Sequence, residues 1–403
     1  MKSYFMTRYD IILYGATGFT GQRAAAYLQE HAPMSVRWAI AGRNEKKLLN
    51  LKRELNLNVD ALVADATNEE DIDILVQQTQ VLMTTVGPYA LYGSELVRHC
   101  AKYGVHYVDI TGESPWVRDM LEEYGEIAQA TKAKIIPFCG FDSIPADLGV
   151  WFLQKYMRET WQSELVEAKA YYTLAGGGLN GGTLLSALNM LEKGEEKRLA
   201  NPKLLTKDLK HRHFIPKIRN RKKNHYAKEI DKWVYPFFMA EINTKVVYRS
   251  IALAAEYNLP HPNQFIYQEY HAIGKRIPAL MGTVGMASFG ILGQFKPFRS
   301  LVKKLGPSSG EGPKETDIEE GFFKLRIVGE DNQGHRAMMT LKYNGDAGNK
   351  ATICFLCESA LALSLDIERL PNYSGFLTPT IAFDSILLER LIAAGLEISC
   401  ETI

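Results

Sequence analysis

The chain has 403 residues, more than one ordinary hydrophobic core can hold, so two or three domains are expected. Its composition, 46% hydrophobic and 23% charged, excludes a disordered or fibrous chain and is typical of a soluble globular protein. The net charge of +1 gives no sign of a nucleic-acid partner, and none is expected. Five scattered cysteines do not form a disulfide framework, and the N-terminus lacks the apolar core of a signal peptide. A cytoplasmic protein is therefore expected.

From residue 9 to about residue 138, short β-branched runs alternate with segments of helical periodicity. Strands are expected at 9–14, 36–41, 59–64, 81–86, 105–110 and 134–138, and helices at 19–31, 44–56, 69–78, 91–103 and 116–131. Strands that alternate with helices of this length form right-handed crossovers and a parallel sheet. The pattern predicts an α/β fold whose first domain, over 1–145, is a doubly wound parallel Rossmann sheet that binds NAD(P).

A glycine-rich turn, "GATGFTG", lies between the first expected strand and the first expected helix. The N-terminus of a helix offers unpaired backbone N–H groups and a partial positive charge, which favour a phosphate. Gly15 permits the tight turn, Gly18 removes a side chain that would block a pyrophosphate, and Gly21 allows close packing of helix and strand. The residues expected to bind the cofactor here are Gly15, Ala16, Thr17, Gly18, Phe19, Thr20 and Gly21.

The residues at the end of the second expected strand indicate whether the site prefers NAD(H) or NADP(H). A site that prefers NAD usually has an Asp or Glu there, whereas this chain reads "AGRNEKK", with Arg43 and Asn44. An arginine can bind a 2′-phosphate by charge-assisted hydrogen bonds, and a carboxylate would repel it. The sequence therefore favours NADP(H) over NAD(H); a solvated basic helix start is the alternative.

The carboxyl ends of the other parallel strands supply the remaining candidates, because ligands bind at that edge of the sheet. The expected cofactor contacts are Asp65, Val86, Gly87, Pro88, Thr111 and Gly112, and the candidate catalytic residues are Tyr89, Tyr92 and Asp142. Tyrosines also serve as packing residues, and "FDSIPADLG" also reads as a helix start with Asp142 or Ser143 as its N-cap. No metal site is expected.

The remaining chain predicts a second, α+β domain over 146–374 that is built on a mainly antiparallel sheet and binds the substrate. Its expected strands are 165–174, 245–254, 322–329 and 336–344, followed by helices at 350–365 and 380–395. Glycines at 176–178, 181 and 182 precede a helix that begins near Thr183; they form either a second anion site or a tight turn that packs closely.

Two stretches have unusual charge. Residues 203–223 are strongly basic, and 277–295 carry no charge between basic flanks. Four glycines and Pro278 argue against a helix that spans a bilayer. The uncharged run either covers a hydrophobic substrate pocket, packs in a homodimer, or makes a peripheral membrane contact through 277–304. Solvated loops are the remaining alternative.

Several blocks together resemble the saccharopine dehydrogenase-like oxidoreductases, in the branch that holds the trans-acting enoyl reductases. These blocks are "GATGFTG", "AGRN", "VGPYALYGSELVRHCAKYGVHYVDITGE", "GFDSIPADLG" and "GFLTPTIAFDSILLERLIAAGLEI". The resemblance implies a Rossmann domain followed by an α+β domain, with a C-terminal helix over 375–403 that packs back onto the first. One departure is Gly345-Asp-Ala-Gly-Asn349, where the family usually reads Gly-Asp-Pro-Gly-Tyr.

What the resemblance implies for function is an NADPH-dependent oxidoreductase that reduces an unsaturated, enoyl or carbonyl, substrate in lipid metabolism. Two alternatives stay open. One is an amino-acid-linked dehydrogenase of the saccharopine type. The other is a membrane-associated scaffold that binds NADPH without turnover.

Overall fold

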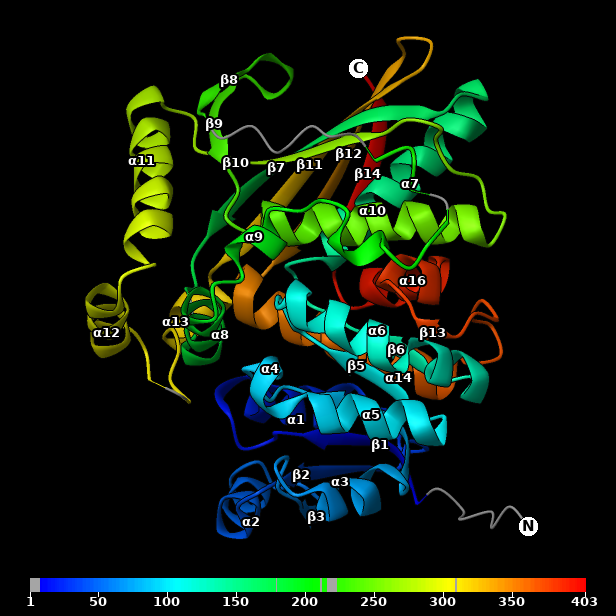
Figure 1. The fold of residues 1–403 in the computed structure, drawn as a ribbon, viewed down its shortest axis with the longest axis vertical. Coiled ribbons are helices and arrows are strands. Elements are labelled where there is room, and N and C mark those ends of the chain that lie inside the picture. Colours follow the sequence, from blue (N-terminus) through cyan, green and yellow to red (C-terminus); the bar gives the residue numbers. More distant parts are fainter. Residues whose placement is uncertain (1–7, 179, 211, 216–222, 309) are drawn as a thin grey trace.

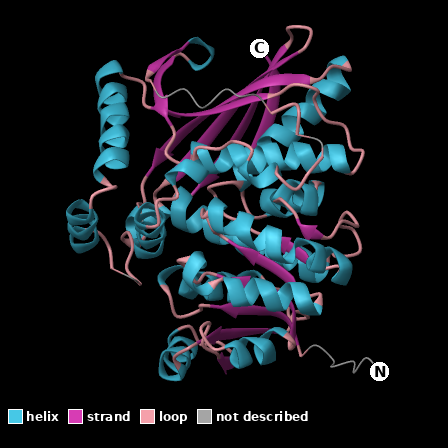
Figure 2. Cartoon of the chain, in the orientation of Figure 1, coloured by secondary structure: helices cyan, strands magenta, loops and turns pink. Residues whose placement is uncertain are grey.

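The computed structural model describes residues 8–403 except 179, 211, 216–222 and 309. It contains two seven-stranded sheets, and helices lie between them as well as on their outer faces (Figures 1 and 2). Residues 216–222 of the basic stretch lie outside the described residues.

The first sheet is parallel throughout and has the strand order β13-β6-β5-β4-β1-β2-β3. Its elements are β1 (Tyr9–Tyr14), α1 (Phe19–His31), β2 (Trp38–Gly42), α2 (Glu45–Glu54), β3 (Asp60–Val63), α3 (Glu69–Val76), β4 (Thr79–Thr84), α4 (Tyr89–Tyr92), α5 (Ser94–Tyr103), β5 (His106–Asp109), α6 (Ser114–Thr131), β6 (Lys134–Ile136) and, from the far end of the chain, β13 (Gly375–Phe376). Ile11, Ile12 and Leu13 of the central strand β1 are fully buried, as expected where helices cover both faces. The predicted doubly wound sheet is confirmed.

The second sheet has the order β14-β12-β11-β7-β10-β9-β8, and only the pairing of β7 with β10 is parallel among the described strands. The elements are α7 (Ile144–Trp161), β7 (Leu165–Ala175), α8 (Gly181–Glu192), α9 (Glu196–Leu199), β8 (His225–Ala227), β9 (Lys232–Pro236), α10 (Ala240–Glu256), β10 (Ile266–Ala272), α11 (Arg276–Leu292), α12 (Lys296–Leu305), α13 (Glu315–Glu319), β11 (Phe322–Asp331), β12 (Arg336–Asn344) and β14 (Glu397–Thr402). The mainly antiparallel second sheet is also confirmed.

The expected strand at 245–254 is wrong, because these residues lie within helix α10. Every residue of α10 from Ile242 to Ala255 is buried. Because α10 is buried on all sides, its polar residues, such as Lys245 and Arg249, do not mark a solvent face, and its sequence lacks a clear helical period to oppose an apparent alternation.

The C-terminal region is also not one helix. After α14 (Thr352–Leu365), the chain adds β13 to the first sheet and forms α15 (Pro379–Phe383) and α16 (Ser385–Ala393). It then pairs β14 with β12 at the edge of the second sheet. Asp384, with φ of +46°, interrupts the expected helix over 380–395. The expectation of a helix across 375–403 is therefore wrong, and this segment contributes to both sheets.

Helix α14 joins the two halves. It packs against α1 and β4 on one side, and its Phe355 contacts Phe323 of β11 on the other. Cys354 and Cys357 are buried within this helix. A redox or metal role is not needed to explain the pair, because both side chains fill the core.

Candidate active site

Two glycines of the turn between β1 and α1 are required by the protein's own packing. Gly15 has φ of +88°, and a Cβ atom there would lie 2.4 Å from Cγ2 of Val86. A Cβ atom on Gly21 would lie 2.1 Å from the carbonyl oxygen of Gly15. The chain therefore folds back on itself so tightly that neither position has room for a side chain.

Gly18 is different, because the protein leaves space beside it. A Cβ atom there would meet only the carbonyl oxygen of Gly15, at an ordinary 3.5 Å. Gly18 is the N-cap of α1 without a side-chain cap, and the first turn of the helix has no acidic residue. First-turn amides without a side-chain cap, a favourable helix dipole and a missing side chain fit a pyrophosphate group at this position.

A segment of the second half covers this turn. A Cβ atom on Gly312 would lie 2.2 Å from Cζ of Phe19, so the chain crosses directly above that ring. The Arg23 guanidinium lies 3.9 Å from the centroid of the same ring and forms a 2.5 Å ion pair with Glu315 of α13. The expected phosphate site is thus bounded by both halves of the molecule.

The residues expected to select the cofactor lie at the ends of β2 and β3. Arg43 is exposed. Asn44 caps α2, since its side-chain oxygen accepts the N–H of Lys47 at 3.0 Å. Hydrogen bonds from the N–H and hydroxyl of Thr67, and to a smaller extent the charge of Arg43, lower the pKa of Asp65. The exposed Arg43 thus places a positive charge at the carboxyl end of β2, whereas Asn44 caps the helix α2.

At the other end of the site, two loops of the first half face helices of the second. A Cβ atom on Gly87 would lie 3.3 Å from Oγ of Ser186 in α8. A Cβ atom on Gly112 would lie 3.2 Å from Cδ1 of Ile242 in α10. The loops after β4 and β5, which include Val86, Pro88 and Thr111, consequently form one wall of a junction between the two halves.

Tyr89 has a structural environment. Its hydroxyl donates to the carbonyl oxygen of Thr84 at 3.3 Å and accepts the N–H of Ile110 at 3.4 Å. Burial raises its pKa well above the usual value. The Glu113 carboxylate accepts the N–H groups of Tyr89 and Ala90, at 2.8 and 3.0 Å. Tyr89 thus fixes the ends of β4 and β5.

Tyr92 and a cavity lie close to the same loops. Tyr92 is half-buried at the end of α4. A cavity of about 220 Å³ opens beside α4, α6 and α8. Its lining includes Ala90, Glu113, Trp116, Asn189, Met190 and Lys193. The cavity adjoins the loops after β4 and β5, which are expected to contact the cofactor, so it is a candidate for part of the substrate space.

The third catalytic candidate, Asp142, stands beside a buried polar cluster that was not expected. Asp142 follows β6 and is half-buried, and desolvation raises its pKa to about 6. Behind it, Glu269 of β10 accepts hydrogen bonds from the hydroxyls of Tyr267 and Tyr172, at 2.7 and 3.2 Å, and from Nδ2 of Asn243 at 3.0 Å. Burial above all, opposed by these hydrogen bonds and assisted by the charge of Asp142, raises the pKa of Glu269 to about 8.

Sequence reasoning missed this cluster because its members come from three separated segments. Ser143 connects it to the start of α7, since its Oγ donates to Oδ1 of Asn243 at 3.4 Å. The available signal was a glutamate inside a mostly apolar and aromatic run, "FIYQEYHA". A carboxyl group that is buried in a strand needs partners, and these partners mark a polar site.

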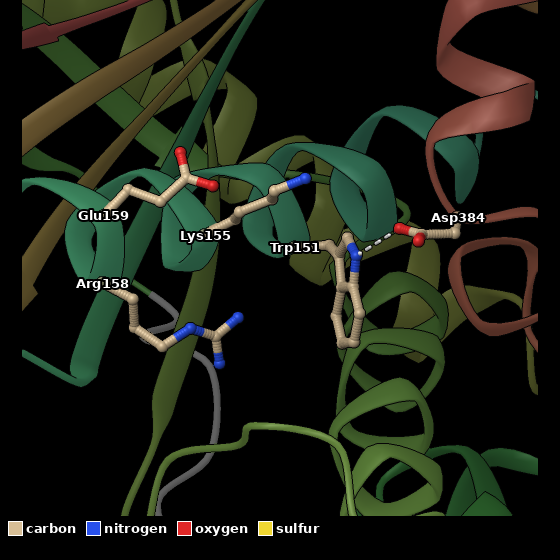
Figure 3. Close-up of a pocket in the computed structure, with 5 residues that line it drawn as sticks. All are labelled: Trp151, Lys155, Arg158, Glu159 and Asp384. Atoms are coloured by element: carbon tan, nitrogen blue, oxygen red, sulfur yellow. Dashed lines mark hydrogen bonds between the residues drawn. The ribbon is translucent and has the colours of Figure 1, made fainter. Parts of the chain in front are cut away.

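A larger pocket, of about 340 Å³, lies along the outer face of α7 (Figure 3). It is formed by Trp151, Lys155, Arg158 and Glu159, and Asp384 faces Trp151 from the start of α16, accepting its indole N–H at 3.1 Å. None of these residues lies at the carboxyl ends of the parallel strands. The pocket is therefore separate from the expected cofactor site.

Among the described residues, one group has metal-ligand spacing: the ligand atoms of Glu69, Glu95 and His99 lie within 4.8 Å of one another. The Arg98 guanidinium pairs with both carboxylates, at 2.8 Å from Glu95. This arrangement is explained by an ion-pair network between α3 and α5.

Comparison with known proteins supports the nucleotide-binding half directly. Residues 11–136 match the family model of the saccharopine dehydrogenase NADP binding domain. The chain is 34% identical to the trans-acting enoyl reductase of Mycobacterium bovis over 96% of both chains, and 33% identical to that of Mycobacterium leprae over 97% of both.

A solved structure shares the fold over nearly the full length. Saccharopine dehydrogenase (L-Glu forming) from Saccharomyces cerevisiae has a TM-score of 0.57 and covers 98% of this chain and 100% of its own, at 13% identity. At that identity the likeness concerns the fold alone. It agrees with the two sheets described above.

Proposed function

Because the chain belongs to the saccharopine dehydrogenase-like oxidoreductases and is an NADP(H)-binding member of that family, we propose that it reduces the enoyl double bond of a hydrophobic, lipid-related substrate. The observation that carries this proposal is the likeness to trans-acting enoyl reductases over almost the whole chain, substrate half included. The cavity beside α4, α6 and α8 offers space for a substrate, and its lining combines apolar side chains such as Trp116 and Met190 with charged ones such as Asp119 and Lys193.

NADPH, when bound, supplies a hydride. The residues proposed to hold it are the amides of the first turn of α1 after Gly18, the guanidinium of Arg43 for the 2′-phosphate, and the loops at Val86–Pro88 and Thr111–Gly112. Ser186 and Ile242 face these loops from the substrate half, and they limit where a substrate can lie.

Saturation of a carbon–carbon double bond needs a hydride on one carbon and a proton on the other. We assign the proton to the Asp142 site, where a half-buried carboxyl with a pKa of about 6 can exchange protons near neutral pH. Glu269, with a pKa of about 8, remains protonated behind it at neutral pH. Tyr92 is the second candidate, since its half-buried side chain follows the loop at Val86–Pro88. The hydroxyl of Tyr89, by contrast, already forms hydrogen bonds with backbone groups.

The reaction is tested by NADPH consumption with an enoyl-thioester, with the matched saturated thioester, and with glutamate plus an aldehyde. We expect consumption with the unsaturated thioester only, and transfer of deuterium from labelled NADPH to the product. Consumption with glutamate plus aldehyde alone would replace the proposal with a saccharopine-type dehydrogenase. NADPH binding without turnover on the whole panel would favour a scaffold.

The proton donor is tested by Asp142→Asn. We expect kcat to fall about 100-fold and the decline in rate above a pH of about 6 to disappear, with NADPH affinity unchanged. Tyr92→Phe is the matched variant, because it removes a hydroxyl near the same loops. A normal rate in Asp142→Asn together with a large loss in Tyr92→Phe would transfer the role to Tyr92.

A further inference from the structure

The helices α11 and α12 expose large apolar side chains that a globular protein normally buries. In α11, Ile277 is 71% exposed, Met281 68% and Ile291 63%, and Ala279 is its one buried residue. The next helix continues this surface, with Leu305 76% exposed and no buried residue. Both helices stand at the left edge of the molecule in Figure 1, outside the two sheets. Because these side chains face outward, they do not line a pocket within the part of the chain that the structure describes.

The segment that forms this surface carries only positive charges. Residues 275–310 contain six basic residues and no Asp or Glu. The basic residues are Lys275, Arg276, Lys296, Arg299, Lys303 and Lys304, at the start of α11 and along α12. Apolar side chains bordered by cations match the boundary between acyl chains and anionic headgroups.

The corner between the helices is a defined structure. The guanidinium of Arg299 donates to the carbonyl oxygens of Gly293 and Gln294, at 3.0 and 2.8 Å, and the rings of Phe289 and Phe298 lie 5.9 Å apart. Arg276 lies over the Trp233 ring of β9, with its guanidinium 5.5 Å from the ring centroid. The apolar surface is therefore presented by elements that the fold holds in place.

Within the part of the chain that the structure describes, no single helix is long and apolar enough to cross a bilayer; α11 and α12 pass that test only as a pair bent by 119°. We propose that residues 275–305, the α11–α12 corner, lie in the surface of an anionic lipid membrane. A second copy of the chain is the less favourable occupant, because a symmetric contact would bring the basic residues of two corners together without any acidic partner from this segment.

The position of the corner agrees with a lipid-related substrate. Helix α12 packs on α8, and Gly306 at its end would place a Cβ atom 2.3 Å from Cδ2 of Leu184. Helix α8 also carries Ser186, which faces Gly87, and Asn189, which lines the cavity. The docking surface and the candidate site are thus connected by one helix. This link depends on the proposed function, whereas the docking itself does not.

The test is co-sedimentation of the full-length chain with vesicles of phosphatidylcholine that contain phosphatidylglycerol, against vesicles of phosphatidylcholine alone. We expect binding to the anionic vesicles that weakens with added salt. The double variant Met281→Glu/Ile291→Glu should lower partitioning by about ten-fold or more, since two exposed apolar side chains no longer enter the lipid. Lys303→Glu/Lys304→Glu should have a similar effect on anionic vesicles only.

The matched control is Ile74→Glu, which changes an exposed apolar residue of α3, 57% exposed, and should leave partitioning unchanged. NADPH affinity and thermal unfolding of each variant show that the fold is intact and report on the proposed cofactor site separately. Absence of binding to anionic vesicles would overturn the proposal. So would a dimer, detected by light scattering, that the Met281→Glu/Ile291→Glu variant dissociates.

Discussion

Two glycine-rich turns of this chain each connect a strand to a helix, yet the structure gives them different surroundings. One lies between β1 and α1 and the other between β7 and α8. Both begin with a glycine in the left-handed region, Gly15 at φ of +88° and Gly176 at +74°. By glycine content alone, either is a candidate anion site.

The difference is in the amides of the following helix. At α1 the N-cap is Gly18, without a side-chain cap. At α8 the side chain of Asn180 accepts the N–H of Thr183 at 3.0 Å, and the N–H of Gly181 donates to the carbonyl oxygen of Glu311 at 2.9 Å. The second turn therefore serves packing. This is the second of the two interpretations given to it from the sequence, a tight turn rather than an anion site. A glycine-rich turn marks an anion site only where the helix amides lack protein partners.

The sharpest test of this comparison is Gly18→Ala. We expect NADPH affinity to fall about 100-fold, close to 3 kcal/mol, because the added methyl group occupies the space needed by the pyrophosphate. The protein itself has room for the methyl group, 3.5 Å from the Gly15 oxygen, so unfolding should change by no more than about 1 kcal/mol. Calorimetric titration with NADPH and denaturant unfolding measure the two effects. Undiminished affinity would remove the phosphate site from this turn.

The counterpart in the second turn is Gly177→Ala. Its φ is +66°, and a Cβ atom would lie 2.2 Å from Oδ2 of Asp346. We expect a loss of about 2 kcal/mol in the free energy of unfolding, from backbone strain and the clash, with NADPH affinity unchanged in the folded protein. Denaturant unfolding checks the first effect and titration the second. A selective loss of affinity would show that this turn also contributes to the cofactor site.

Arg43→Asp tests whether the guanidinium after β2 binds the 2′-phosphate of NADPH. We expect the ratio of NADPH to NADH affinity to fall by at least about ten-fold, or 1.4 kcal/mol, because a carboxylate repels the 2′-phosphate. Stability should hardly change, since Arg43 is exposed. Parallel titrations with the two cofactors give the ratio. A variant that kept the original preference would contradict the role assigned to Arg43.

The smallest effect is expected for Asn180→Ala. It removes the N-cap of α8, which should cost about 1 kcal/mol of unfolding free energy. NADPH affinity should stay the same, because the amides of α8 are not proposed to bind a phosphate. Asn44→Ala, at the N-cap of α2, is a matched cap removal in the first half. If Asn180→Ala gained affinity for inorganic phosphate, the side chain of Asn180 would be what prevents anions from binding to the amides of α8.

The amino-acid sequence alone was sufficient for the features that depend on neighbouring residues. The alternation of strands and helices predicted the parallel sheet, and the spacing of Gly15, Gly18 and Gly21 predicted the turn that precedes α1. Arg43 at the end of β2 indicated the cofactor. These features can be predicted because the periodicity of a strand or helix and the conformation of a turn depend on residues that are close together in the sequence.

Only the tertiary structure decided which segments meet. Residues 245–254 belong to the helix α10, which is buried on all sides, although their alternation had suggested a strand. Two of the three hydrogen-bond partners of Glu269, Tyr172 and Asn243, come from β7 and α10, so neither the cluster nor the raised pKa of Glu269 could be read from β10 alone. Helix α11 is as apolar as a core helix, and its exposure follows from the absence of a covering element among the described residues. The periodicity of apolar residues shows which side of a helix or strand is apolar. Whether that side is buried, and what pKa a side chain on it has, depends on the residues that the fold packs against it.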